Sequence, residues 1–82
     1  MSKAKMVLDL YKLVKEARRM VTEAYGLSQE VEPDGWRNPN HPEHLIDLAE
    51  TVLNEAEKST RDWAAAVAGS KTLIEEEREN GI

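Results

Sequence analysis

A seven-residue repeat of apolar residues runs through the second half of this 82-residue chain. Seven residues nearly complete two helical turns, so the residues of one track lie along one side of a helix. The repeat therefore predicts one long helix over residues 43–79 that packs along its length. The three tracks that stay in phase are Leu45/Val52/Ser59/Ala66/Leu73, Ile46/Leu53/Thr60/Val67/Ile74 and Ala49/Ala56/Trp63/Ser70.

The first part of the chain predicts a shorter helix over residues 3–25. Its apolar residues recur every three or four positions in two parallel sets, which merge into a stripe wider than a simple dimer seam, as in a helix bundle. Gly26 is the expected end of this helix, because glycine readily adopts the left-handed conformation that follows many helices. The two sets are Val7, Leu10, Val14, Ala17, Val21 and Ala24, and Met6, Leu13, Met20 and Leu27.

Residues 26–42 predict a loop, because they hold all three prolines and lose the apolar periodicity. Asn40 is the expected cap of the helix that follows, and Pro42 is tolerated in its first turn, where the missing N–H would have no partner. Glu43 stands where the acid of a capping box reaches back to the cap.

Two positions threaten the continuity of the second helix. Ser59-Thr60 can open a third helix, and Gly69 disfavours helix by about 1 kcal/mol relative to alanine. Because the tracks pass both positions in phase, the sequence favours one continuous helix, or one kinked within residues 59–70. That helix would span ~55 Å and the first ~35 Å, so about 20 Å of the longer helix would lack a partner in its own chain.

This mismatch predicts an all-α fold: a helical hairpin that assembles through its long second helix into a homo-oligomeric bundle. Eighty-two residues form one domain near the lower size limit for folding alone, so association would add needed burial. The predicted interface between copies consists of Leu53, Trp63, Val67, Leu73 and Ile74.

Composition and charge narrow the functional classes. No cysteine is present and no apolar run is long enough to span a bilayer, so we expect a soluble, cytoplasmic protein without membrane contact. The net charge of −5 is uneven: residues 1–25 carry +3 and residues 26–82 carry −8. The acidic majority argues against extended nucleic acid as a partner, because it would repel the phosphate backbone.

No catalytic or metal motif is recognisable, and we expect neither an enzyme nor a cofactor. The one metal-like cluster is also typical of a capped, solvated helix start, where carboxylates favour the positive end of the helix dipole. The acidic run over residues 75–79 is typical of a solvated helix end rather than of a magnesium site. The cluster consists of His41, Glu43, His44 and Asp47.

Two surfaces remain as candidate binding sites. Trp36-Arg37 in the loop either plugs the end of the hairpin or anchors a partner, since both residue types are enriched in binding hot spots. A basic face on the first helix either pairs with acidic residues of a neighbouring helix or binds a small phosphorylated ligand, with tyrosine stacking on a base. That face consists of Tyr11, Lys12, Lys15, Arg18 and Arg19.

The order of Glu16-Ala17-Arg18, a loop and Leu48-Ala49-Glu50-Thr51-Val52-Leu53 is loosely similar to that of small helical viral proteins that assemble and sequester cyclic nucleotide signals. The similarity is one of pattern, and no residue role is transferred from it. The leading expectation is a non-catalytic interaction protein, such as a viral or mobile-element accessory factor that binds and blocks a host macromolecule. Sequestration of a phosphorylated small molecule and a scaffold role are the alternatives.

Overall fold

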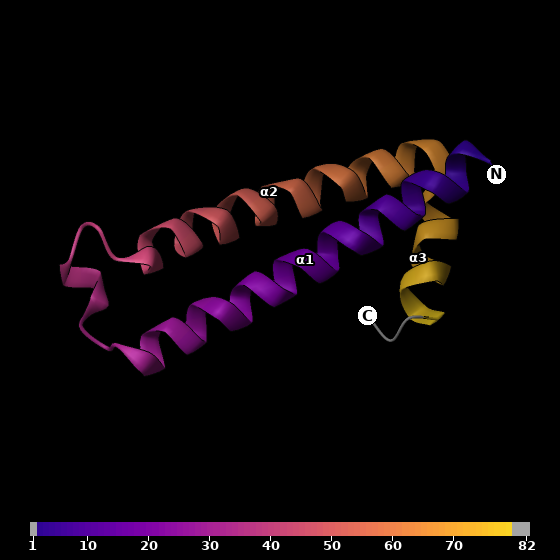
Figure 1. Cartoon of the computed structure of the whole chain (residues 1–82). Coiled ribbons are helices and arrows are strands. Elements are labelled where there is room, and N and C mark those ends of the chain that lie inside the picture. The colour runs from indigo at the N-terminus through magenta and orange to yellow at the C-terminus, as the bar shows by residue number, and fades with distance from the viewer. Residues whose placement is uncertain (1, 80–82) are drawn as a thin grey trace.

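The structure, a computed structural model, describes residues 2–79. Helices make up most of this range and no strand occurs within it, so the predicted all-α class is confirmed. None of the helices described is long and apolar enough to cross a lipid bilayer. The elements follow one another as α1 (Lys3–Val31), the short 3-10 helix η1 (Gly35–Arg37), α2 (Pro42–Ala68) and α3 (Ser70–Glu79) (Figure 1).

The two long helices, α1 and α2, lie side by side and run in opposite directions, joined by the loop that carries η1 (Figure 1). The short helix α3 turns away at the far end of α2 and lies close to the first turns of α1. The molecule is elongated, with extents of 46 × 21 × 19 Å. Within residues 2–79, α1 and α2 therefore have only each other as neighbours over most of their length.

Side-chain caps explain where the two long helices begin. At the start of α1, the hydroxyl of Ser2 accepts a hydrogen bond from a first-turn backbone N–H at 3.1 Å. The cap of α2 is His41 rather than the predicted Asn40: Nδ1 of His41 accepts a hydrogen bond from the N–H of Glu43 at 3.0 Å. Each acceptor satisfies an N–H group that has no partner inside its helix.

The first helix is longer than predicted, because it continues through Gly26 to Val31. A positive φ, which would end a helix, occurs among the described glycines only at Gly69. The loop thus shrinks from the predicted residues 26–42 to residues 32–41. α1 has 29 residues and α2 has 27, so the two helices match in length and the predicted overhang of the second helix is wrong.

The second predicted helix is broken at Gly69, between α2 and α3. The backbone angles of Gly69, φ 93° and ψ 142°, are adopted essentially only by glycine. Ser59-Thr60 opens no new helix, because both residues lie inside α2 and the Thr60 hydroxyl donates to the carbonyl of Ala56 at 2.7 Å. The kink predicted within residues 59–70 is a full break at a single residue.

The core lies at one end of the molecule, where the three helices meet. Its most buried large side chain is Leu73 of α3, which is 1% exposed. This core is small, and it leaves much apolar surface of α1 and α2 uncovered toward the loop end. The core consists of Val7, Leu8, Tyr11, Ala64 and Leu73, with Ala65, Val67 and Ala68 packed against it.

Alanine substitutions at two glycines test these helix bounds. Gly26→Ala should stabilise the chain by up to about 1 kcal/mol, because position 26 is helical and an added Cβ would meet no atom within 4 Å. Gly35→Ala should destabilise it, because a Cβ there would lie 2.8 Å from Cε1 of His41 and 3.0 Å from Oε2 of Glu43. Denaturant unfolding measures both, and a destabilising Gly26→Ala would show that α1 ends near residue 26.

Candidate functional site

An exposed apolar stripe runs along α1 on a side away from its core residues. Among its large side chains, Leu13 is 65% exposed and Met20 is 60% exposed. Its members recur in alternating steps of four and three residues, the spacing of a helix-packing seam. The two sets of apolar residues predicted on the first helix do not separate these residues from the inward-facing ones, although the alternating spacing is the signal that distinguishes them. The stripe consists of Met6, Leu10, Leu13, Ala17, Met20, Ala24, Leu27 and Val31.

A matching stripe runs along α2 with the same alternating spacing. Its larger side chains are also exposed, including Leu45, Val52 and Trp63, and the exposed Leu48 borders them. Alanine and serine occupy the stripe positions between these large side chains. The surface of the stripe is therefore recessed near the middle of the helix. Its members are Leu45, Ala49, Val52, Ala56, Ser59, Trp63 and Ala66.

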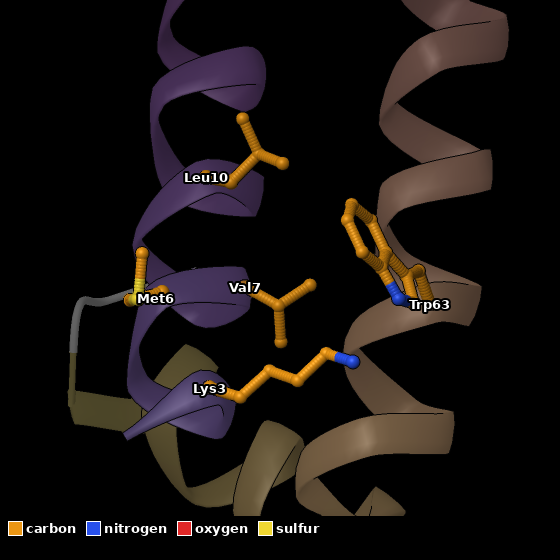
Figure 2. A pocket seen from close by; sticks show the side chains of 5 residues that line it. All are labelled: Lys3, Met6, Val7, Leu10 and Trp63. Atoms are coloured by element: carbon orange, nitrogen blue, oxygen red, sulfur yellow. The ribbon is translucent and has the colours of Figure 1, made fainter. Parts of the chain in front are cut away.

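The two stripes border one groove at the core end of the molecule. The groove has a volume of about 370 Å³ and is lined by Lys3, Met6, Val7, Leu10 and Trp63. Figure 2 shows Val7 of α1 pointing across the space toward Trp63 of α2, with Met6 and Leu10 on the α1 side. Because the groove joins members of both stripes, the stripes open on the same side of the helix pair. We call the two stripes together the open apolar face.

The helix α3 packs on the other side of the pair. Leu8 and Tyr11 share the core with Leu73 of α3. At about 100° per residue, they lie roughly 150° around α1 from the centre of its exposed stripe. The pair therefore has one side that α3 partly covers, and an opposite side on which the open apolar face is bare over the part of the chain that the structure describes.

The residues predicted to form an interface between copies lie in different environments. Trp63, 48% exposed, belongs to the open apolar face, and Ile74 is exposed on α3. Leu53 is half-buried, and Val67 packs against the core. Leu73 was predicted to contact another copy, but it is buried in the core of its own chain because α3 folds back.

Two of the four cations of the predicted basic face, Lys12 and Arg18, form ion pairs with carboxylates of the same chain. Lys12 forms an ion pair with Glu76 of α3. Arg18 reaches Glu57 of α2, with 3.4 Å between Nε and Oε1. Arg19 is exposed. These pairs agree with the structural alternative of helix-to-helix attraction, and binding of a phosphorylated ligand stays a prediction.

Tyr11, expected to stack on a base, is instead buried at the junction of the three helices. Its hydroxyl donates a hydrogen bond to Oε1 of Glu77 at 2.9 Å, and the Lys15 ammonium lies 5.6 Å from its ring centre. Burial and the hydrogen bond to Glu77 raise the pKa of Tyr11 to about 12. Burial acts to raise the pKa of Glu77, but hydrogen bonds from Tyr11 and Arg61 outweigh it and lower that pKa below its usual value.

The loop presents Trp36 and Arg37 on the surface. Trp36 is 60% exposed, so it does not plug the end of the helix pair. The Arg37 guanidinium lies 5.1 Å from the centre of the Trp36 ring, within cation–π range. This stacking holds the two side chains together as one exposed unit, and their role in binding a partner stays a prediction.

The metal-like cluster serves to close the loop. Nε2 of His41 lies 2.5 Å from Oε2 of Glu32, while Nδ1 of the same ring caps α2. His44 contacts a loop carbonyl through Nε2 at 2.9 Å, and Glu43 is 3% exposed. Within residues 2–79, no three His, Asp or Glu side chains are grouped to hold a metal ion.

Comparisons with known proteins add no assignment to this geometry. No family model, characterised protein or solved structure matches the chain. Its function is therefore argued from its own residues.

The junction around Tyr11 should respond to pH at both extremes. Because the pKa of Tyr11 rises from 10.0 to about 12 on folding, the stabilisation from its neutral form is complete below pH 10 and is lost as pH rises through 12. Because the pKa of Glu77 is lowered, its contribution is present above the usual carboxylate pKa and is lost as pH falls through the folded value.

The absorbance of tyrosinate measures the alkaline step. Tyr11→Phe should remove the ionisation near pH 12, whereas the matched variant Tyr25→Phe should retain it. If the ionisation near pH 12 disappears in Tyr25→Phe and persists in Tyr11→Phe, Tyr11 is not the buried tyrosine of the junction.

Proposed function

We propose that this chain is a non-catalytic interaction protein that works as a homo-oligomer: a helical hairpin whose open apolar face packs against the same face of another copy in a helical bundle. One observation carries the proposal. Two apolar stripes, in phase over both long helices, are left exposed on the same side of the pair. Contiguous exposed apolar surface of this extent is rare on monomers and marks interaction sites.

The area of the face supports a stable contact. The exposed large side chains of α1 and α2 that belong to it, which range from 38% exposed at Leu10 to 85% at Val31, offer on the order of 1,000 Å² of surface per copy, whereas a standard interface buries about 800 Å² per partner. Burying Trp63 and its neighbours would also enlarge a core that one chain keeps small.

The shape of the face supports a second copy as the occupant. Each stripe is flanked by an inward-facing column, such as Val7, Val14 and Val21 on α1, that is buried or half-buried at the contact with α2. A helix with such a column beside its seam is typical of a bundle of four helices, in which every helix has two neighbours. Since α1 and α2 match in length, two copies present faces of equal extent, and self-complementary pairs of this kind close with twofold symmetry.

An accessory protein of this kind would bind and block a further macromolecule. That partner would contact a surface of the chain that remains exposed in the assembly. The loop at the end of the bundle is such a place, and we propose that Trp36 and Arg37 form its recognition tip. Their exposure and mutual stacking support this, because a preformed Trp–Arg pair costs little ordering on binding.

Acidic substitutions on α1 test the face directly. Leu13→Glu with Met20→Glu should convert the oligomer to a monomer, because charges would be buried at the interface without partners. Helicity should persist, since both side chains are exposed in the single chain. Sedimentation equilibrium gives the mass and circular dichroism gives the helicity.

The matched control is Thr22→Glu with Gln29→Glu, which adds the same charges with the same spacing at exposed positions outside the stripe. This control should keep its oligomeric mass. If the unmodified chain is a folded monomer at micromolar concentration, or if both double variants dissociate equally, the open apolar face is not the assembly surface.

A further inference from the structure

We propose that α3 is exchanged between copies, so that the α3 of one chain docks on the α1/α2 pair of another. The joint between α2 and α3 is a single residue, Gly69. Its N–H donates to the carbonyl of Ala65 at 3.0 Å, and its carbonyl accepts from the N–H of Leu73 at 3.1 Å. Both are helical hydrogen bonds across four residues, so only the backbone angles of Gly69 separate the two helices.

The sequence pattern is compatible with a straight form. Across the break, the seven-residue tracks stay in phase, leading from Trp63 to Ser70 and from Ala66 to Leu73. Returning Gly69 to helical angles would replace a conformation that is essentially confined to glycine, and would join α2 and α3 into one helix from Pro42 to Glu79. A short strained hinge of this kind favours exchange of the element that follows it.

A released α3 needs a docking site. With ten residues it is too short to be a stable helix by itself. Its main anchor, Leu73, is the most buried large side chain among the residues that the structure describes. Once α2 has straightened, Leu73 no longer reaches its own core, and the site that can bury it is the same site on another copy.

Charge makes that site selective for α3. Two acidic residues of α3 dock on α1 and α2: Glu76 pairs with Lys12, and Glu77 accepts hydrogen bonds from Tyr11 and from Nε of Arg61 at 3.1 Å. Every contact in the closed chain can be reproduced between two chains, because each copy supplies both halves. Such reciprocal exchange is a low-cost route to dimers.

The exchange stands independently of the open apolar face. Since α3 packs on the opposite side of the pair, its site is available whether or not that face is covered. The two modes of association therefore respond to different substitutions. Changes at Leu13 and Met20 should affect association through the open apolar face, whereas changes at Lys12, Gly69 and Glu76 should affect the exchange of α3.

Charge reversal with mixing tests the exchange. Lys12→Glu alone and Glu76→Lys alone each place like charges together at the α3 site, in the closed and in the exchanged form, so both should have a lowered Tm. An exchanged heterodimer of the two variants restores both pairs: Lys12 with Glu76 at one site and the reversed pair at the other. Co-refolding an equimolar mixture should raise the Tm by several degrees and yield heterodimer well above the one half expected of random pairing, as measured by native mass spectrometry.

The double variant Lys12→Glu/Glu76→Lys is the control, because it restores the pair within one chain and should recover the Tm without mixing. A second measurement uses Gly69→Ala, in which alanine disfavours φ 93° and favours helix. The exchanged fraction should rise severalfold at fixed concentration, whereas Gly26→Ala should leave it unchanged. Random pairing without a rise in Tm, or a closed monomeric Gly69→Ala protein, would overturn the exchange.

Discussion

One neighbouring helix cannot cover three adjacent apolar columns, and this constraint governs the whole molecule. α1 and α2 each carry an inward column and two further columns that form an exposed stripe. Packing the two helices together buries or half-buries the inward columns and leaves the stripes bare on one side, where Trp63 and Met6 border a common groove. A single copy therefore leaves these apolar side chains exposed, which is the physical basis for proposing assembly as its function.

The other side of the helix pair is partly covered by α3 of the same chain. There α3 folds back, buries Leu73 against α1 and α2, and pairs Glu76 with Lys12 of α1. The carboxylate of Glu77, held by Tyr11 and Arg61, links all three helices at one point. Two residues of the predicted basic face, Tyr11 and Lys12, thus bind carboxylates of the acidic end of the sequence, while Arg18 binds Glu57 of α2.

The helical class, the start of α2 to within a residue or two and a loop that contains Trp36 follow from local patterns, and these could be predicted from sequence. The exposure of Trp36 could not, because the sequence left open whether that side chain plugs the end of the helix pair. The two glycines could not be told apart. Gly26 and Gly69 both interrupt runs of good helix formers, yet one is helical and the other is a break. The difference depends on docking of α3, because burial of Leu73 offsets the loss of a continuous helix, and seven-residue periodicity contains no information about that contact.

If the open apolar face is solvated in one chain and buried between chains, assembly changes the surroundings of Trp63, and the fluorescence of this residue measures that change. In a Trp36→Phe background, Trp63 is the remaining tryptophan. Its emission should be that of a half-exposed indole at high dilution and should move to shorter wavelength over the concentration range in which the mass rises. A Trp63 emission wavelength that stays constant while the mass rises would rule out burial of this face between chains. The same holds if the monomer already emits like a protein with a fully buried indole.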